Sequence, residues 1–321
     1  MTYCALVTGC AGQDGSYLTK SLLSKGYRVV GTSRNIECEI SNHKKLNIFN
    51  EFEIVQCSLN SVSNFRSLVN RYFPDEIYHL SAQSSVGQSF NKPLETFGSI
   101  VNTTSTILEV CRDLDFAGRI FFAGSSEMFG ETKEMATISS PIKPISPYGL
   151  AKYQSLLISK MYKDIYKLNT VNGILFNHES PLRGNNFVTH KIVNGALECL
   201  KNRNFKIKLG NIDIYRDWGW AEEYVEAIQL ITRSRELENS LICTGEIHSL
   251  KEFAKLTFSK IGLNYKDHIE YEKKYSRPFE IHKSQGNPSP LNQKTGWEAK
   301  IKFNKVIDLL IEEKLQKLPI K

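Results

Sequence analysis

The sequence has no apolar run that approaches the roughly 20 residues needed to cross a lipid bilayer as a helix. We also expect no signal peptide, because Met1 leads directly into an apolar, strand-like segment at Cys4–Thr8. These two absences argue against membrane-spanning proteins and against secreted proteins with a cleavable leader. We therefore expect a cytoplasmic protein with no membrane insertion.

The seven cysteines follow no metal-binding or disulfide pattern. They are an odd number, are scattered along the chain, and form no CxxC pair or Cys/His cluster. We expect several of them to pack as small apolar side chains. The sequence therefore predicts neither a zinc site nor a disulfide framework, and we expect no metal ion.

A dense basic tract is absent as well, although 41 Lys and Arg residues outnumber 34 Asp and Glu residues and give a net charge of +7. The basic residues are dispersed, which argues against a nucleic-acid partner. Such a charge distribution fits a phosphorylated small-molecule substrate better. The apolar share of 41% is ordinary for a soluble globular protein.

Short apolar segments alternate with longer helical patterns in the first half of the chain. The apolar segments are predicted to form strands at residues 5–8, 28–31, 53–56, 76–80 and 119–123. Helices are predicted at residues 16–25, 64–72 and 96–111, and a further one starts near Tyr148. This alternation predicts an α/β fold with a doubly wound, parallel Rossmann sheet and right-handed crossovers.

The pattern becomes irregular after about residue 175, with helices predicted at residues 222–233, 250–261 and 303–316. We predict that residues 1–175 form a dinucleotide-binding Rossmann domain that carries the catalytic residues. Residues 176–321 are predicted to form mainly a smaller C-terminal α/β lobe that binds the substrate and is interleaved with the sheet.

A glycine-rich turn, Thr8–Gly15, connects the first predicted strand to the first predicted helix. Gly9, Gly12 and Gly15 have the spacing GxxGxxG, the variant seen in short-chain dehydrogenases. Glycines here allow a tight turn, close approach of a pyrophosphate to backbone N–H groups, and close helix–strand packing. Between a strand and a helix, the triplet predicts a dinucleotide site more strongly than a merely structural turn.

The end of the second predicted strand has no carboxylate to accept a hydrogen bond from the ribose 2′-OH of NAD. Instead, Ser33 and Arg34 stand there, and an arginine is suited to a 2′-phosphate. We therefore predict NADP as the cofactor, with NAD as the less favoured choice. The alternative is that Arg34 is only a solvated surface charge.

Tyr148 and Lys152 are four residues apart in a predicted helix, so both can lie on one helical face. A nearby ammonium favours the phenolate of tyrosine, whose pKa is otherwise about 10. Such a tyrosine can take a proton from a sugar hydroxyl while a hydride leaves the same carbon. The alternative is an ordinary helical pair, although the preceding Pro147 and the upstream Ser125 argue against it.

Ser125 and Glu127 follow the fifth predicted strand. Hydride transfer alone does not need a second base, whereas removal of a proton next to a carbonyl does. Glu127 therefore raises the question of whether oxidation serves an elimination. The alternatives are that Ser125 caps a loop and that Glu127 is a solvated carboxylate or an ion-pair partner.

Several stretches of the chain are similar, in order, to one enzyme family. They are residues 12–18 (GQDGSYL), 176–184 (FNHESPLRG), 187–191 (FVTHK), 210–219 (GNIDIYRDWG), 221–227 (AEEYVEA), 244–249 (TGEIHS), 277–280 (RPFE) and 296–297 (GW). On these stretches, which span nearly the whole chain, the sequence resembles the extended short-chain dehydrogenase/reductases. The closer match is to the GDP-mannose 4,6-dehydratase family.

The resemblance implies a mechanism for Ser125, Glu127, Tyr148 and Lys152. Tyr148 would take the proton of the sugar 4-OH while a hydride moves from C4 to the nicotinamide. Lys152 would lower the pKa of Tyr148 and hold the nicotinamide ribose, and Ser125 would hydrogen-bond the 4-oxygen. Glu127 would then remove the C5 proton and assist loss of the 6-OH as water, before the hydride returns to C6.

The resemblance also implies the ligand contacts. The cofactor would contact the three glycines, Arg34, Tyr148 and Lys152, and in addition Gln13, Asp14, Leu59, Leu80 and Ala82. A GDP-sugar would contact Ser84, Asn177, Lys191, Arg216, Arg277 and Glu280. The basic residues would meet the diphosphate and Glu280 the nucleotide ribose. His178 remains either a packed core histidine or a contact, and a homodimer or homotetramer is expected.

Three positions depart from the family pattern. Ser125 stands where the family usually has threonine, and Cys57–Asn60 lacks the aspartate that lies near the adenine. Arg34 stands alone where the family usually has paired arginines that touch both NADP and a neighbouring subunit, and the segment after it is shortened. These departures bear on the adenine contacts, on the choice of NADP and on the tetramer.

Two other functions are compatible with the same residues. An NADP-dependent 4-keto-6-deoxy nucleotide-sugar reductase or a C4 epimerase also needs Ser125, Tyr148 and Lys152, and a reductase can carry a glutamate near residue 127. A non-catalytic NADP-binding regulatory protein is disfavoured because all three residues are present. The NHESP–LRG stretch favours the dehydratase, which would convert GDP-mannose or a related GDP-sugar to a GDP-4-keto-6-deoxy sugar.

Overall fold

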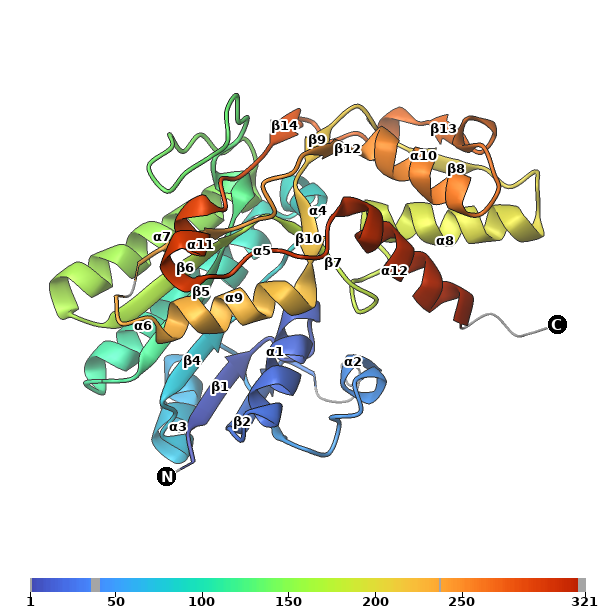
Figure 1. Ribbon diagram of the computed structural model, residues 1–321. Helices are drawn as coiled ribbons and strands as arrows, with labels where there is room; N and C mark the ends of the chain where they lie inside the picture. The colour runs from blue at the N-terminus through green and yellow to red at the C-terminus, as the bar shows by residue number, and fades with distance from the viewer. Residues whose placement is uncertain (1, 36–40, 237, 317–321) are drawn as a thin grey trace.

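The computed structural model describes residues 2–35, 41–236 and 238–316. A seven-stranded sheet lies at its centre, and every strand pair in this sheet is parallel (Figure 1). The pairing runs from Ser33 opposite Gln56 at one side of the sheet to Ile242 opposite Leu175 at the other. In spatial order the strands are β11 (Ser240–Ile242), β6 (Asn169–Leu175), β5 (Arg119–Ser125), β4 (Glu76–His79), β1 (Cys4–Thr8), β2 (Arg28–Ser33) and β3 (Glu53–Gln56).

Helices cover both faces of this sheet, which explains why its central strands are apolar along their whole length. On one face, α1 (Gln13–Ser24) packs beside α9 (Ala221–Arg233) over a core that includes Leu18, Phe121 and Ile228. On the other face lie α3 (Val62–Tyr72), α6 (Thr103–Asp113) and α7 (Pro147–Tyr166).

The strand order reverses at β1, which has β2 on one side and β4 on the other. In open parallel sheets, ligands bind in the crevice outside the carboxyl ends of the strands at such a switch point. The glycine turn follows β1 at this edge, and the segments after β4 and β5 open onto the same edge. The topology therefore brings the predicted cofactor and catalytic segments together.

A smaller lobe has its own apolar core, in which Trp218, Phe253 and Phe303 pack together. Its helices are α8 (Val188–Lys201), α10 (Leu250–Lys260) and α12 (Phe303–Gln316). Short strands pair in three small sheets: β7 (Asn177–Glu179) with β10 (Trp218–Trp220), β8 (Ile207–Leu209) with β13 (Ile269–Tyr271), and β9 (Tyr215–Arg216) between β12 (His248–Ser249) and β14 (Lys283–Ser284).

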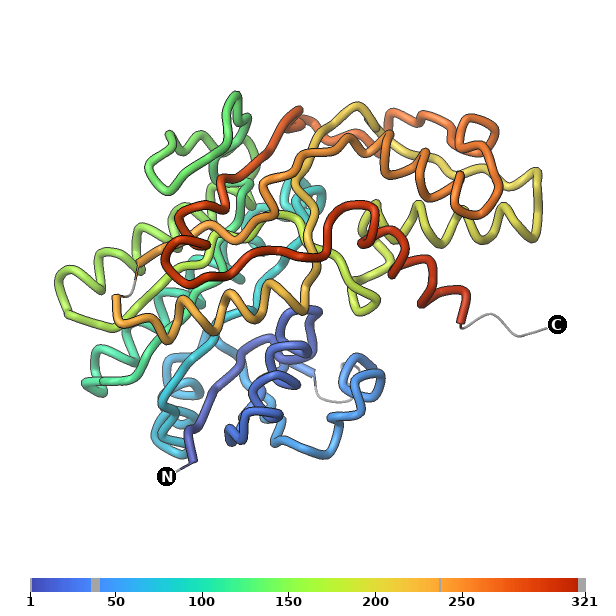
Figure 2. Tube along the Cα trace, in the orientation of Figure 1, coloured from blue at the N-terminus to red at the C-terminus, as the bar shows by residue number. Residues whose placement is uncertain are grey.

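The chain passes repeatedly between the sheet and this lobe (Figure 2). After β7 and α8 it returns to the sheet as α9 and β11, enters the lobe again as α10, and comes back as α11 (Ser289–Thr295), which packs on β11. The remaining short elements are α2 (Ser41–Lys45), α4 (Val86–Asn91), α5 (Pro93–Phe97) and single helical turns at Gly98–Asn102, Ser126–Met128, Tyr265–Asp267 and Lys273–Tyr275.

The doubly wound parallel fold predicted from the sequence is confirmed, and its five predicted strands occur as β1 to β5. The helix predicted at residues 96–111 is interrupted, because a π-turn at Gly98–Asn102 separates α5 from α6. Cys4, Cys10, Cys57, Cys111, Cys199 and Cys243 are buried, in line with the expectation that several cysteines pack as small apolar side chains, and Cys38 lies outside the described residues. Within the described ranges, no helix is both long and apolar enough to span a membrane.

Candidate functional site

The glycine turn after β1 requires glycine for steric reasons. Gly9 has a φ of +72°, and a Cβ there would lie 2.7 Å from the backbone of Ser81. A Cβ on Gly15 would collide with the carbonyl oxygen of Gly9. Gly12 directly precedes α1 and has no side chain to cap its first amides. The turn therefore leaves the start of α1 open to an anionic group such as a pyrophosphate.

Gln13 and Asp14, at the start of α1, are tied to the stretch that begins with β7. Gln13 Nε2 donates to Asp14 Oδ1 (3.0 Å) and to the carbonyl of His178 (3.3 Å), and Ser180 Oγ donates to Gln13 Oε1 (2.8 Å). His178 Nε2 lies 3.0 Å from both oxygens of Asp14. These contacts join the predicted cofactor turn to the predicted substrate stretch.

His178 faces hydrogen-bond acceptors with both ring nitrogens. Its Nδ1 lies 2.7 Å from the carbonyl oxygen of Phe176, and its Nε2 faces the Asp14 carboxylate. Since a carbonyl and a carboxylate can only accept, both nitrogens must carry a proton to satisfy these contacts. Burial opposes that charge, but Asp14 outweighs it and raises the pKa of His178. Burial likewise opposes ionisation of Asp14, but His178 outweighs it and lowers the pKa of Asp14.

Ser125 ends β5, and Tyr148 and Lys152 lie in the first turns of α7. Ser125 Oγ accepts a hydrogen bond from the N–H of Glu127 (3.3 Å) and caps the helical turn that follows β5, so it does cap a loop. Lys152 Nζ donates to the carbonyl of Ala123 (2.7 Å) and lies 5.8 Å from the centre of the Tyr148 ring. The three side chains therefore share one edge of the sheet.

Burial dominates the proton affinities of this pair. It raises the pKa of Tyr148 to about 12, with the Ser125 hydroxyl and the charge of Arg183 acting in the opposite direction. It also lowers the pKa of Lys152 to about 8. The ammonium four residues away therefore does not bring the pKa of Tyr148 below its ordinary value, contrary to the simple expectation from spacing.

Glu127 lies in the helical turn after Ser125 with its side chain only 12% exposed. Arg277 Nη1 approaches its carboxylate at 3.7 Å and also lies 3.1 Å from Glu280 Oε1. Arg216 is buried and donates to the same Glu280 oxygen at 2.8 Å. Burial raises the pKa of Glu127, while Arg277 and Arg216 oppose the rise. Arg277 thus adjoins the predicted base, and Glu280 and Arg216 follow it in the same group of charges.

Lys191 lies apart from this group of charges. Its Nζ donates to the carbonyl of Lys208 (2.6 Å) and lies 3.6 Å from the ring centre of Tyr275. The other predicted ligand residues belong to the same edge of the sheet or to the segments beside it. Leu59 is buried, Leu80, Ala82 and Asn177 are half-buried, and Arg34 and Ser84 are exposed.

Two charged residues near the site were not singled out from the sequence. Arg183 Nη1 donates to Glu179 Oε1 (2.8 Å) and to the carbonyl of His178, and its guanidinium lies 4.0 Å from the Phe187 ring centre. Asp217 is buried and accepts three hydrogen bonds from Thr244 and Gly245, while burial raises its pKa to about 6. Arg183 lies in the family-like stretch 176–184, and Asp217 lies in the stretch 210–219. Their positions in these stretches are the sequence feature that could have indicated them.

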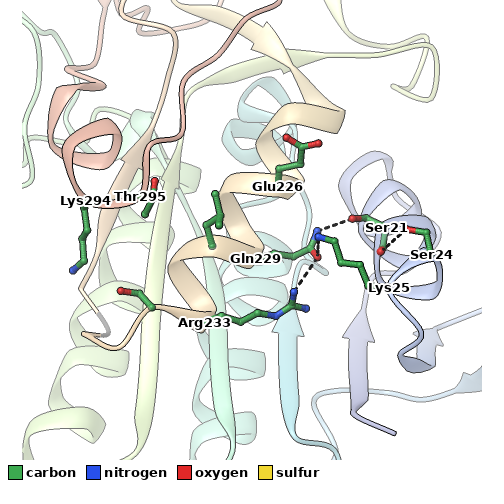
Figure 3. A pocket seen from close by; sticks show the side chains of 10 residues that line it. Ser21, Ser24, Lys25, Glu226, Gln229, Arg233, Lys294 and Thr295 are labelled. Carbon is green, nitrogen blue, oxygen red and sulfur yellow. Dashed lines mark hydrogen bonds between the residues drawn. The ribbon is translucent and has the colours of Figure 1, made fainter.

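A surface groove of about 690 Å³ lies away from these residues, between α1, α9 and α11 (Figure 3). Its cations already have partners: Lys25 donates to Gln229, Arg233 pairs with Glu76, and Lys294 pairs with Glu238. The groove contains none of the residues predicted for the site. The residues predicted for the site lie instead at the carboxyl edge of the sheet and in the segments beside it.

The sheet, the glycine turn and the Tyr148–Lys152 pair define an extended short-chain dehydrogenase/reductase. Solved structures share this fold: a UDP-glucose 4-epimerase of Thermus thermophilus in complex with NAD has a TM-score of 0.85 at 23% identity, with 98% of this chain and 100% of that chain covered. A dTDP-glucose 4,6-dehydratase of Bacillus anthracis in complex with NAD has a TM-score of 0.87 at 19% identity, with 98% and 97% covered.

Sequence comparison narrows the class. The family model described as GDP-mannose 4,6 dehydratase matches residues 6–310, and the chain belongs to this family. It is 39% identical to GDP-mannose 4,6 dehydratase 1 of Arabidopsis thaliana, covering 97% of this chain and 90% of that protein. It is 34% identical to the human GDP-mannose 4,6 dehydratase, covering 94% and 89%, and 32% identical to the Vibrio cholerae GDP-mannose 4,6-dehydratase, covering 97% and 94%.

Proposed function

We propose that this protein is a 4,6-dehydratase that converts GDP-mannose, or a closely related GDP-sugar, to a GDP-4-keto-6-deoxy sugar. The observation that carries the proposal is the largely buried carboxylate of Glu127 beside Ser125, with arginines on its other side. A plain oxidoreductase needs no such base. A base with a raised pKa is suited to removing a proton next to a carbonyl near neutral pH.

The glycine turn fits a dinucleotide cofactor, because a side chain at Gly9 or Gly15 would fill the space that the backbone needs. Gly12, Tyr148 and Lys152 would hold such a group, and Arg34, directly after β2, supports NADP over NAD. When bound, the cofactor would supply a hydride acceptor for C4 of the sugar and return that hydride at C6. The two structural relatives that carry NAD support a nicotinamide cofactor in general.

The proton transfers fall to the side chains of this chain. Tyr148, aided by Ser125, would accept the proton of the sugar 4-OH as C4 is oxidised. The carbonyl so formed acidifies the C5–H bond, and Glu127 would remove that proton. Protonated Glu127 would then donate to the leaving 6-OH, so that one water is lost and the carboxylate is restored. Return of the hydride to C6 leaves C5 to be protonated, and the proton that Tyr148 took from the 4-OH would be passed to C5. Tyr148 and Glu127 thus end in their starting states.

The substrate diphosphate would be bound by Arg216, Arg277 and Lys191. Two of these are arginines, whose planar guanidinium groups make paired contacts with phosphate oxygens. Glu280, which already orients both arginines, would accept a hydrogen bond from the nucleotide ribose. The side chains of Ser84 and Asn177 would contact the sugar end.

A 4-keto-6-deoxy nucleotide-sugar reductase or a C4 epimerase is the second candidate, because Ser125, Tyr148 and Lys152 would serve it equally. Purified protein incubated with GDP-mannose distinguishes the two. The dehydratase should release a product lighter by one water, detected by mass spectrometry, without added reduced cofactor. Turnover that requires stoichiometric NADPH would favour the reductase, and cofactor binding without conversion of any GDP-sugar would favour a regulatory protein.

A second copy of this chain is the proposed partner, paired through α7. The inner side of this helix is buried against the sheet, whereas Leu150, Leu157, Met161 and Ile165 are exposed. Their spacing places all four on one face of the helix. An exposed apolar helical face of this kind supports an interface between identical subunits, as a dimer or as the building unit of a tetramer.

A further inference from the structure

Four charged side chains form an alternating row that begins at the predicted base. Glu127 adjoins Arg277 at 3.7 Å, Arg277 adjoins Glu280 at 3.1 Å, and Glu280 adjoins Arg216 at 2.8 Å. Arg216 ends the row, since it also donates to the carbonyl groups of Tyr215 and Ile281. The row therefore links the catalytic edge of the sheet to the small three-stranded sheet that contains β9.

The row places one cation beside the predicted base, where both side chains are only partly exposed. The side chain of Glu127 is 12% exposed and that of Arg277 is 30% exposed, so solvent screens this contact only in part. The other charged or titratable groups that act around Glu127 are Arg216, which favours its ionised form, Glu280, which opposes it, and Tyr148 of α7. Arg277 is the largest favourable influence among them.

We infer that Arg277 is a positioning residue for the elimination step, which holds the Glu127 carboxylate ionised and aimed, in addition to any contact with the diphosphate. The inference rests on the proposed function, because it assigns the base of that reaction its partner. The same Arg277 guanidinium group would then contact both the substrate diphosphate and the Glu127 carboxylate. Binding of the nucleotide end would thereby be coupled to the proton affinity of the base at the sugar end.

Lys191 is a suitable comparison, because it is a lysine that is predicted to bind the same diphosphate as Arg277. Its ammonium contacts the carbonyl of Lys208 and the ring of Tyr275, and no ionic contact joins it to Glu127 in the described part of the chain. Loss of Lys191 should therefore weaken substrate binding without altering the base. Loss of Arg277 should do both.

The test compares kcat as a function of pH, at saturating GDP-mannose, for Arg277→Gln, Arg277→Lys and Lys191→Gln. Removing a positive charge raises the pKa of a nearby carboxylate, so the acid limb of kcat for Arg277→Gln should move up by about one pH unit. At pH values below that limb, kcat of Arg277→Gln should be about tenfold lower than kcat of the unsubstituted protein. In Arg277→Lys the acid limb should return most of the way to its pH in the unsubstituted protein. Lys191→Gln should raise KM and leave the acid limb at its original pH.

A titration that needs no turnover separates this inference from the proposed function. Glutamate side chains labelled with ¹³C are followed by NMR against pH, and the Glu127 signal is assigned by its loss in Glu127→Gln. The carboxyl of Glu127 should titrate about one unit higher in Arg277→Gln than in the unsubstituted protein or in Lys191→Gln. Circular dichroism establishes that each variant is folded.

An unmoved Glu127 titration in folded Arg277→Gln would overturn the inference, whether or not the protein is active. An equal displacement of the acid limb in Lys191→Gln would overturn it as well, since the effect would then follow substrate binding. Failure of the unsubstituted protein to dehydrate any GDP-sugar would instead defeat the proposed function, and the NMR titration would still decide the role of Arg277.

Discussion

At the scale of single residues, burial changes the pKa of both proposed proton-transfer groups in the same direction. It raises the pKa of Tyr148 to about 12 and also raises the pKa of Glu127, so burial alone favours the protonated form of each. The influences that favour ionisation are local: Ser125 and Arg183 act on Tyr148, and arginines act on Glu127. The charges that favour ionisation of Tyr148 and Glu127 thus include arginines outside the Tyr148–Lys152 pair.

Glu127→Gln should stop the proposed reaction after its first half. The amide keeps the size of the side chain but cannot accept the C5 proton, so kcat for loss of water should fall by about 10²- to 10⁴-fold. Oxidation at C4 uses Tyr148 and should persist. Rapid mixing with GDP-mannose should then show reduced nicotinamide absorbance that accumulates and does not decay, with nucleotide affinity nearly unchanged.

Tyr148→Phe is the matched control for this experiment, because it removes one oxygen from the same site and blocks the earlier step. It should lose turnover by a similar factor without any accumulation of reduced nicotinamide. Full activity in Glu127→Gln would remove the carboxylate from the mechanism. A normal rate in Tyr148→Phe would remove the Tyr148 hydroxyl from the mechanism.

The residue types of the candidate site could be predicted from spacing and resemblance, but their electrostatics could not. The pairing of Arg277 with Glu127 joins two segments far apart in the sequence, and it depends on how the lobe folds back on the sheet. The sign of the pKa change at Tyr148 depends on burial, which local spacing does not reveal. The charge of His178 could not be predicted from the sequence, because it follows from the two acceptors that face its ring nitrogens.

At the scale of secondary-structure elements, the ion pair of Asp14 and His178 fastens the start of α1 to β7. Its side chains are 21% and 12% exposed, so the pair is largely shielded from solvent. The ring of His178 also packs 4.6 Å from the ring of Tyr224 in α9. The side chain of His178 therefore connects three elements around the predicted cofactor turn, namely α1, β7 and α9.

His178→Asn should destabilise the fold by about 2 kcal/mol near pH 6, because it leaves the largely buried Asp14 carboxylate without its cation. The pKa of His178 is raised on folding, so its contribution is complete below the unfolded value of about 6.5 and is lost as the pH rises through the folded value. The pKa of Asp14 is lowered, so its contribution is lost only in acid, as the pH falls through the folded value.

Urea unfolding at about pH 6 and about pH 9 measures this dependence. The difference in unfolding free energy between the unsubstituted protein and His178→Asn should be larger at the lower pH. His282→Asn is the control, because His282 is exposed and should show little difference at either pH. A difference for His178→Asn that is the same at both pH values would mean that the ring is not charged in the folded protein.

The elements that could be predicted from the sequence are those with a strong local pattern. β1 to β5 are apolar runs between turn residues, and α9, α10 and α12 carry apolar residues at helical spacing. The short strands could not be predicted, because their pairing is decided elsewhere in the chain. β9, for example, has two residues and is stabilised by β12 and by β14, which follows much later.

At the scale of the whole molecule, the two parts of the chain share one framework. α9 and β11 come from the second part of the sequence but pack on, or belong to, the central sheet. The predicted ligand residues are divided between the sheet edge and the lobe, and the Glu127–Arg277 contact crosses from one to the other. Closure of the proposed site therefore depends on how these two parts are held together.

The exposed apolar face of α7 predicts an assembly of identical subunits. Leu157→Lys combined with Ile165→Lys places two charges on this face, far from the buried Tyr148 side of the helix. The double variant should sediment as a monomer in analytical ultracentrifugation, whereas the unsubstituted protein should sediment as a dimer or tetramer. A stable dimer buries roughly 1,200–2,000 Å² in total, so two charges at its centre should suffice to separate the subunits.

Tyr271→Lys is the matched control for this variant, because Tyr271 is 68% exposed and lies on β13, away from α7. It should leave the sedimentation coefficient unchanged. An unsubstituted protein that is monomeric at micromolar concentration would contradict the interface, and so would a double variant that still assembles. Because α7 also carries Tyr148 and Lys152, a subunit contact along its outer face would hold the catalytic helix in place, so the monomeric variant should lose activity together with assembly.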